Sequence, residues 1–469
     1  MDRLQKIRLS VLVLGTLMGA LDSTIVILAF PVIAEKLNAD ILTTMWVILI
    51  YLLIVAALTV QLGRLGDIFG RTRMFNLGFG IFTASSFFCG ISATITALIL
   101  FRGVQAMGGA LMEANSGAII ADIFPPGSRG AAFGYNSLGW TVGATLGIVL
   151  GGVITTFIGW EYIFFINVPI GIAALYLGTR YLKDVTRTPA SLDIIGMALL
   201  TAGLALISYA AVDFAGNGLT ELSATLALLG FALILIFVWH ETHTKTPTIS
   251  FESLKEPILK YSLLAAFLQS LGYIAVVFLI TMYLQGIRGL TPLDAALLLT
   301  PGYVMGSVLG PYMGRLSDRV GARIIATIGT MVIAVAILIY MAIRVDSSLT
   351  LVLLASFISG IGTAMFYPAN NSAIMAHARM EDYGSVSGAL RMVQNIGVLG
   401  SFVLAITVAS ASIPRALAFE IFTGTSQVVG HVAGAFIQGI DAALVVSFLL
   451  LLLAGAMSWA RGSEHRDTT

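Results

Sequence analysis

The chain has 469 residues, of which 58% are hydrophobic and 10% charged, and its mean hydropathy is +0.96. Soluble domains average about 25% charged residues, so this composition predicts a protein that lies mostly in lipid. The formal net charge of +1 provides no basic face for nucleic acid, and the single cysteine, Cys89, excludes an internal disulfide.

Long apolar runs follow one another along the whole chain. A helix needs about 20 apolar residues to cross a bilayer, and the runs are continuous rather than alternating, which excludes a β-barrel. Fourteen runs meet this length: 9–31, 43–63, 74–92, 97–120, 131–156, 163–181, 193–212, 222–239, 259–284, 294–313, 324–343, 350–375, 384–411 and 441–460. The sequence therefore predicts an all-α integral membrane protein with 14 transmembrane helices.

The positive residues fix the expected orientation. If the N-terminus is cytoplasmic and the connectors alternate, 20 of the 25 Lys and Arg residues fall on the inner side. Adding or removing one segment would destroy this bias. We therefore expect a multi-pass protein of a cell (inner) membrane with both termini in the cytoplasm.

An internal repeat divides the chain. GRLGDIFGRTR (63–73) follows the second segment, and GRLSDRVGAR (314–323) follows the tenth. The repeat predicts an N-terminal six-helix bundle over 1–182, an inserted two-helix hairpin over 183–258 and a C-terminal six-helix bundle over 259–469. Repeated halves of this kind are typical of secondary transporters with a midplane site.

The repeated loop has a physical logic of its own. Its glycines permit a tight turn and close helix approach, Asp67 can accept from helix-terminal amides or pair with an arginine, and Arg71 can face lipid headgroups. Such a charge cluster can latch helix ends in one conformation and release them in another; the alternative is an ordinary basic loop. The gating candidates are Gly63, Asp67, Gly70, Arg71, Gly314, Asp318, Arg319 and Gly321.

These loops resemble the signature of the major facilitator superfamily. LDSTIVILAFP (21–31), LFRGVQAMGGA (100–110) and WEYIFFINVPIG (160–171) are similar to motifs of its fourteen-segment drug:proton antiporters. The resemblance implies the major facilitator fold, alternating access, and export of amphipathic, lipophilic or cationic small molecules in exchange for protons. It also implies a monomer in contact with membrane lipids, driven by the proton gradient without a cofactor.

The chain departs from these motifs at several positions. Ile27, Ile68 and Ala106 replace an asparagine, an arginine and a glycine, and Ile148 replaces the proline of the fifth-helix antiporter motif. A proton symporter or facilitator for a specific metabolite therefore remains an alternative. Small-residue spacing for close helix packing persists in that helix at Gly143, Gly147 and Gly151.

Two acidic residues, Asp22 and Glu113, lie deep in expected helices. A central aspartate costs ~2.5–3.5 kcal/mol on insertion scales, so it is by default a functional candidate. Arg102 lies eleven residues before Glu113, within about 20° of the same helix face but about 16 Å along the axis. We expect Asp22 and Glu113 to bind protons or cationic substrate, with Arg102 tuning the carboxylate that approaches it. The alternative is a static pair that fixes helix packing.

Other polar and aromatic residues are candidates for lining a substrate cavity. Asn136, Trp140, Gln269 and Asn370 are the main ones, although helix–helix hydrogen bonding explains the amides equally well. Tyr273 and Tyr367 are candidates for stacking against an aromatic cation.

Several other functions lack the residues that they need. No GxxxxGK[ST] loop is present, and no cysteine–histidine set has zinc spacing, so neither nucleotide hydrolysis nor a metal is expected. A membrane sensor or an enzyme, the remaining alternatives, would need an output domain or a catalytic constellation. Residues 412–440 are expected to form a long outer connector.

Overall fold

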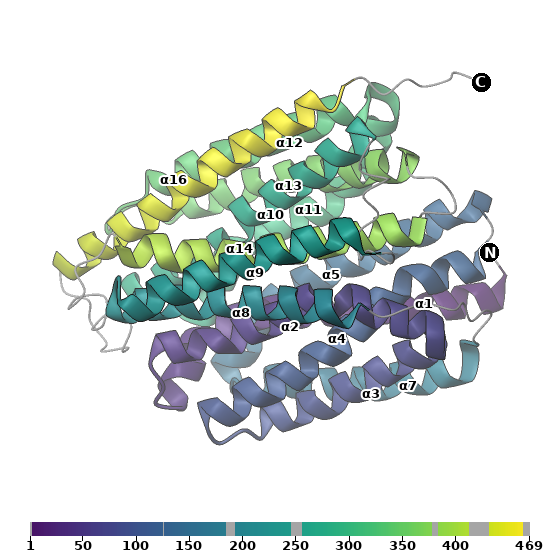
Figure 1. Ribbon diagram of the computed structural model, residues 1–469. Helices are drawn as coiled ribbons and strands as arrows, with labels where there is room; N and C mark the ends of the chain where they lie inside the picture. Colours follow the sequence, from purple (N-terminus) through teal and green to yellow (C-terminus); the bar gives the residue numbers. More distant parts are fainter. Residues whose placement is uncertain are drawn as a thin grey trace. The chain divides into compact units, whose positions relative to one another are not determined.

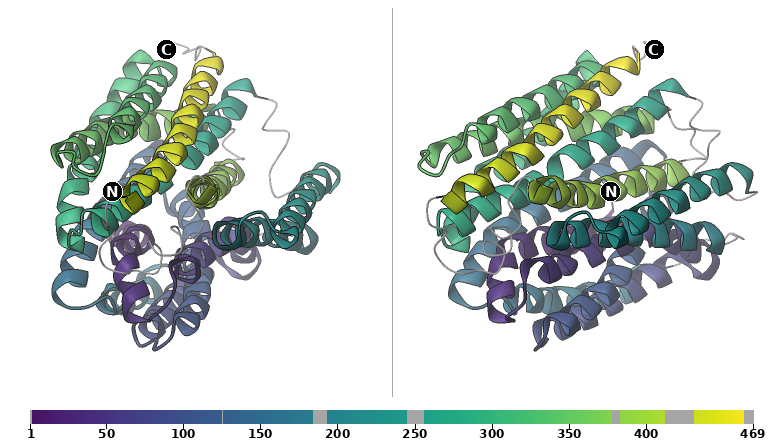
Figure 2. Two further views of the ribbon diagram at one scale, coloured as in Figure 1. Left: turned by 90° about the vertical axis from the view of Figure 1, so that its left-hand side faces the viewer. Right: turned by 60° about the vertical axis from the view of Figure 1, so that its left-hand side comes forward.

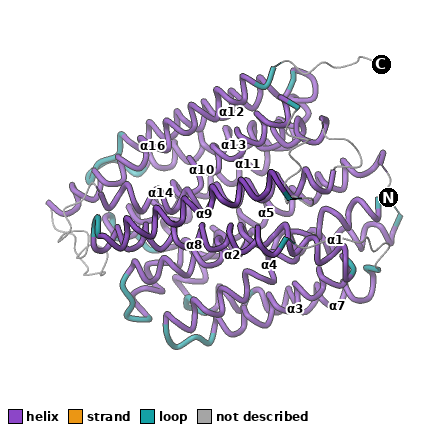
Figure 3. The backbone as a smooth tube through the Cα atoms, in the orientation of Figure 1, coloured by secondary structure: helices purple, strands orange, loops and turns teal. Residues whose placement is uncertain are grey.

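Helices make up all the regular structure that the computed structural model describes, which covers residues 2–124, 126–183, 193–244, 256–377, 383–411 and 431–462. No strand occurs in these ranges (Figure 3). Thirteen helices there are long and apolar enough to cross a membrane. The third predicted segment is also helical, as the 20 residues of α3 (Arg71–Gly90). The expectation of an all-α chain is confirmed.

The chain divides into two compact units, coloured from purple to teal and from green to yellow in Figure 1. The first unit holds all residues up to 248, and residues 289–296 cluster with it. Its helices are α1 (Arg3–Lys36), α2 (Ile41–Phe69), α3, α4 (Ile95–Ile123), α5 (Pro126–Phe157), the short α6 (Tyr162–Phe165), α7 (Asn167–Tyr181), α8 (Ile194–Asn217) and α9 (Glu221–His243).

The core of the first unit is apolar and rich in phenylalanine. Phe75, Phe79 and Phe82 of α3 are fully buried in it, and Phe75 and Phe79 stack edge to face. The helices α8 and α9 form a hairpin at the edge of this unit, with α8 against α2 (Figure 2). Asp193 caps the start of α8 through the Gly196 N–H, and Thr220 caps the start of α9 through the Ser223 N–H.

The second unit contains the remaining long helices, apart from the first five residues of α11, which cluster with the first unit. They are α10 (Pro257–Met282), which continues into the π-helical turn η2 (Tyr283–Ile287), α11 (Pro292–Val320), α12 (Ala322–Met341), α13 (Thr350–His377), α14 (Tyr383–Ala411) and α16 (His431–Ala460). One core cluster of this unit joins Ala265 of α10, Ala326 of α12 and Phe366 of α13.

The two units repeat the same pattern of helix packing. In the first unit α1 packs on α5 and α7, and α3 packs on α4 and α7. In the second unit α10 packs on α14 and α16, and α12 packs on α13 and α16. The first, third, fourth, fifth and last helices of each predicted bundle thus have the same neighbours in both units.

The same backbone turn ends the second helix of each repeat. Gly70 separates α2 from α3 with φ of 107°, and Gly321 separates α11 from α12 with φ of 104°. An L side chain is strained at this φ, so glycine is what lets each helix pair turn in a single residue.

Two boundaries differ from the sequence expectation. The last long helix begins at His431, so residues 431–440 of the expected outer connector are helical; they read HVAGAFIQGI, which is apolar and free of proline. Residues 412–430 of that connector lie outside the described residues. The sixth expected segment is divided at Ile166 into α6 and α7.

Candidate functional site

Asp22 lies on α1 with no exposed surface and forms an ion pair with Arg102 of α4. The carboxylate oxygen Oδ2 and the guanidinium nitrogen Nη1 are 2.5 Å apart, and Arg102 is 2% exposed. The two residues are 80 positions apart in the sequence. Removing one partner from such a buried pair leaves an uncompensated charge, which typically costs 3–5 kcal/mol.

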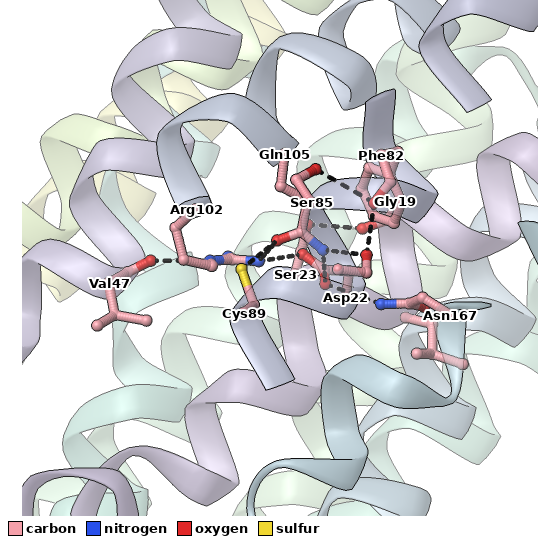
Figure 4. Close-up of polar contacts among 12 residues, drawn as sticks. Gly19, Asp22, Ser23, Val47, Phe82, Ser85, Cys89, Arg102, Gln105 and Asn167 are labelled. Atoms are coloured by element: carbon pink, nitrogen blue, oxygen red, sulfur yellow. Dashed lines mark hydrogen bonds and ion pairs between the residues drawn. The ribbon is translucent and has the colours of Figure 1, made fainter. Parts of the chain in front are cut away.

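Two amides complete the shell around the carboxylate. Gln105 Nε2 donates to Asp22 Oδ1 at 2.9 Å, and Asn167 Nδ2 donates to the same oxygen at 3.1 Å. Figure 4 shows Arg102 and Asn167 converging on Asp22 from opposite sides. Gln105 Nε2 also donates to Ser86 Oγ at 2.7 Å, so the network reaches α3. Both amides occur in the motif stretches, but nothing in the sequence marked them as partners of Asp22.

Arg102 has further neutral partners of its own. Its Nη1 donates to Gln105 Oε1 at 2.6 Å and its Nε to the Val47 carbonyl at 3.1 Å. Its guanidinium lies 4.4 Å from the centre of the Tyr51 ring. These contacts on α2 and α4 give the cation alternative partners if Asp22 is neutralised.

Glu113 lies about three turns along α4 from Arg102, as the spacing of eleven residues requires. It is half-buried. Arg102 therefore pairs with the carboxylate on α1 and not with the one on its own helix.

The first repeated loop forms a three-residue charge cluster. Arg71, in the first turn of α3, donates from Nε to Asp67 Oδ1 of α2 at 2.8 Å. It donates from Nη1 to Asp122 Oδ1, near the end of α4, also at 2.8 Å. The pairing leaves Arg71 directed at carboxylates rather than at lipid headgroups. Asp122 is a partner that the loop motif alone did not reveal.

The second repeated loop has a different set of contacts. If the two motifs are superposed on Gly70 and Gly321, Arg71 corresponds to Ala322. The Ala322 carbonyl accepts from Arg461 Nη2 at 2.7 Å. Arg319 of this loop is exposed, and the side chain of Asp318 lies outside the part of the chain that the structure describes.

The remaining loop glycines, Gly63 and Gly314, face the fourth helix of their repeats. A Cβ at Gly63 would lie 3.5 Å from the Ala114 side chain, and one at Gly314 would lie 3.5 Å from that of Pro368. Both distances are ordinary van der Waals contact.

The glycines of the fifth-helix motif pack α5 on α1. A Cβ at Gly147 would lie 2.6 Å from the Leu21 carbonyl oxygen, and one at Gly151 would lie 3.0 Å from the Ile25 carbonyl oxygen. Gly143 contacts α1 in the same way at Leu17. The segment of α1 that carries Asp22 is thus held directly against α5.

The expected cavity-lining residues have different surroundings. Asn136 is buried and accepts from Thr16 Oγ1 at 2.7 Å, whereas Trp140 is 40% exposed. Asn370 is fully buried, donates to the Ser262 carbonyl at 3.1 Å and accepts from Arg461 Nη1 at 3.2 Å. Gln269 is fully buried in the second unit.

Comparison with known proteins assigns the family. The model of the Major Facilitator Superfamily matches residues 12–402. The chain belongs to the major facilitator superfamily. Proteins of this family are transporters of small molecules and not enzymes, so the chain is a multi-pass membrane transporter with the major facilitator fold. Among the described residues no group of three His, Cys, Asp or Glu side chains is placed to hold a metal ion.

Three similar proteins illustrate the relationship. The multidrug efflux pump LfrA of Mycolicibacterium smegmatis is 26% identical over 478 residues, covering 96% of this chain and 95% of LfrA. The riboflavin transporter RibZ of Clostridioides difficile is 30% identical over 390 residues, covering 83% of this chain and 84% of RibZ. A solved bacterial homologue of the human lysosomal transporter Spinster matches with a TM-score of 0.67 at 19% identity, covering 98% of this chain and 97% of that one.

Proposed function

We propose that the protein is a proton-coupled exporter of amphipathic, lipophilic or cationic small molecules that works by alternating access in a bacterial inner membrane. In this proposal both termini are cytoplasmic, residues 1–182 and 259–469 are the moving bundles, and residues 183–258 are an inserted hairpin. The proton gradient supplies the energy for transport without a cofactor, and the protein works as a monomer.

The observation that carries the coupling is the fully buried Asp22–Arg102 pair. Placing a charged pair inside a membrane helix bundle costs free energy, so such residues usually serve a function. The function that fits this pair is a change in the charge of Asp22 during the transport cycle. A proton on Asp22 would cancel its attraction to Arg102. Arg102 would then rest on Gln105, the Val47 carbonyl and the Tyr51 ring, which it already contacts.

Loss of the ion pair would free α1 from α4. Because α1 also packs closely on α5 through Gly147 and Gly151, the two helices would move together when α1 shifts. At the far end of α4, Arg71 and Asp122 hold α3 and α4 together, and this contact is the proposed latch of one conformation. Proton binding and latch opening would then alternate.

The test uses purified protein in liposomes with an internal pH dye and an imposed proton gradient. Ethidium and uncharged quinizarin are each added, and dye response is compared between wild type and Asp22→Asn. We expect substrate-dependent proton flux in wild type and at least a tenfold loss in the variant. Asp213→Asn is the matched control, because Asp213 lies on α8 and accepts from Asn217 and Thr220 near the turn between α8 and α9.

A second variant separates coupling from folding. Asp22→Asn leaves the cation of Arg102 buried without its counter-charge, whereas the double variant Asp22→Asn, Arg102→Gln removes both charges. If the double variant regains thermal stability but not proton flux, the pair acts in coupling. Full proton flux in Asp22→Asn would refute the proposal and leave Asp22 a structural residue.

A second function, uptake of a metabolite with protons, is favoured by Ile148 in place of the antiporter proline and by the similarity to RibZ, a riboflavin transporter. The same liposomes distinguish the two. Substrate movement against the proton flux supports export, and movement with the proton flux supports uptake.

A further inference from the structure

Two neighbouring helices of the second unit, α12 and α16, bring together an arginine and an exposed tryptophan at their ends. The guanidinium carbon of Arg323, in the first turn of α12, lies 3.9 Å from the centre of the Trp459 ring, near the end of α16. The two helices pack against each other (Figure 1). We propose that Arg323 and Trp459 form a binding site for the headgroup of an anionic phospholipid. The site goes beyond the proposed transport function and depends neither on proton coupling nor on the direction of transport.

Arg323 has hydrogen-bonding capacity that its protein contacts do not use. Its Nε atom is buried without a hydrogen-bond partner, and among the described residues the side chain forms no ion pair. A guanidinium has five N–H donors and is always charged, and stacking on a ring satisfies none of these donors. Arg323 is only half-buried, so a ligand can reach it. A phosphate group supplies both the counter-charge and the acceptor oxygens that a guanidinium binds in two parallel hydrogen bonds.

The neighbouring Arg461 holds this pair in place. It follows Trp459 by two residues and donates from Nη2 to the carbonyl of Ala322, the residue before Arg323, at 2.7 Å. The helices also approach closely at Gly455, where a Cβ would lie 2.9 Å from Thr330 Oγ1 of α12. The end of α16 is therefore fixed against the start of α12. A stacked pair that is already in position loses little entropy when it binds a ligand.

Apolar faces lead along both helices to the Arg323–Trp459 pair. Each helix is long and apolar enough to span a membrane, and each exposes one apolar face at helical spacing. The exposed residues are Ile324, Ile328, Val335 and Leu338 on α12, and Val445, Leu449, Leu453 and Trp459 on α16. Faces of this kind suit acyl chains, and tryptophan is enriched where the acyl chains meet the headgroups. The ligand that fits both the faces and the cation is a lipid rather than a free anion.

The charge around the pair favours an anionic lipid over a zwitterionic one. Arg315 and Arg319, in the last two turns of α11, are exposed and lie in the same loop motif as Arg323. The side chain of Asp318, the carboxylate of this motif, lies outside the described residues. Each arginine near a membrane surface contributes about 1 kcal/mol of attraction to anionic lipid. A zwitterionic headgroup carries an ammonium group that the same arginines repel.

Native mass spectrometry of the full-length protein tests this inference. Delipidated protein in detergent is titrated with phosphatidylglycerol, or with phosphatidylcholine of the same acyl chains, and the lipid-bound populations give each Kd. We expect the Kd for the first phosphatidylglycerol to rise about tenfold in Arg323→Gln, which loses charge-assisted hydrogen bonds. It should rise about threefold in Trp459→Leu, which loses the ring that orients the guanidinium. Phosphatidylcholine should bind wild type about fivefold more weakly than phosphatidylglycerol.

The matched control is Arg73→Gln, which should leave the Kd for phosphatidylglycerol unchanged. Arg73 is an exposed arginine in the first turn of α3, the equivalent helix of the first repeat, where Thr72 occupies the position of Arg323. An equal Kd in wild type, Arg323→Gln and Trp459→Leu would overturn the inference, as would equal binding of phosphatidylcholine. Displacement of the lipid by an equal concentration of inorganic phosphate would overturn the assignment to a lipid. If Arg323→Gln does not fold, Trp459→Leu alone decides the outcome.

Discussion

Arg71 and Asp122 form an ion pair of 2.8 Å that joins the first turn of α3 to the end of α4. The same guanidinium also holds Asp67 on α2, so one cation links three helices where the chain turns at Gly70. Asp67 and Arg71 belong to the repeated loop, whereas Asp122 comes from a different part of the sequence. The charge cluster of the loop therefore forms only when the end of α4 packs against the loop.

We predict that Asp122→Asn lowers the transport rate several-fold and changes thermal stability little. The side chains of Arg71 and Asp122 are 24% and 18% exposed, and ion pairs with solvent access contribute only about 0–1 kcal/mol to folding. A stability effect much larger than this would mean that the pair is structural and not a latch. Transport rates in liposomes and melting temperatures in detergent provide the measurement.

A double-mutant cycle sharpens this test. If Arg71 and Asp122 act as one contact, Arg71→Gln and Asp122→Asn together should slow transport no more than either alone. Additive losses would show that the two residues act separately. Arg73→Gln is the matched control, because Arg73 lies in the same turn of α3 and is exposed.

The carboxylate of Asp193 gives a prediction about pH. Burial alone would raise the pKa of Asp193, but the Gly196 N–H, His240 and Arg64 together hold that pKa below its usual value. A lowered pKa in the folded state stabilises the protein at every pH above the unfolded value of about 3.9. The stabilisation is lost as the pH falls through the folded pKa.

We therefore expect Asp193→Asn to speed amide exchange in α8 and α9 by a constant factor between pH 8 and pH 5. The difference from wild type should shrink only in more acidic solution. Hydrogen exchange of the Gly196 amide is the direct measurement, since this N–H donates to Asp193 at 2.9 Å. A difference that varied between pH 8 and pH 5 would contradict this account.

The sequence predicted the fold well because membrane helices are encoded locally. Most apolar runs correspond to one long helix, and Gly70 and Gly321 mark equivalent turns. The early start of α16 was missed because hydropathy identifies the apolar span and not where a helix first forms hydrogen bonds.

The sequence identified the charged residues of the candidate site but not the ion pair that they form. Asp22 and Arg102 are conspicuous as charges in apolar runs, but their contact depends on how α1 crosses α4. The spacing of eleven residues instead associated Arg102 with Glu113, which is on the same helix. Gln105 and Asn167 could not be distinguished from other membrane amides, because only tertiary packing directs them at Asp22.

Arg461 of the second unit is another residue whose tertiary contacts could not be predicted from the local sequence. It lies at the end of α16, where an arginine ordinarily reads as an interfacial residue. In the structure it is 2% exposed and donates to Asn370, Ser262, Ser458 and the Ala322 carbonyl. Nothing in its local sequence marks it as buried.

The contact between α1 and α5 gives the last prediction. A methyl group at Gly147 would lie 2.6 Å from the Leu21 carbonyl oxygen and 3.2 Å from the Ile25 amide nitrogen, so both helices would have to move apart. Overpacking of this kind typically costs 1–3 kcal/mol. Gly147→Ala should therefore lower the melting temperature and also slow transport, because Asp22 follows Leu21 directly. Gly19→Ala is the matched control, since a Cβ there would have no neighbour within 4 Å and alanine favours the helix. If both variants melt and transport alike, close approach of α5 to α1 is not what holds Asp22 in place.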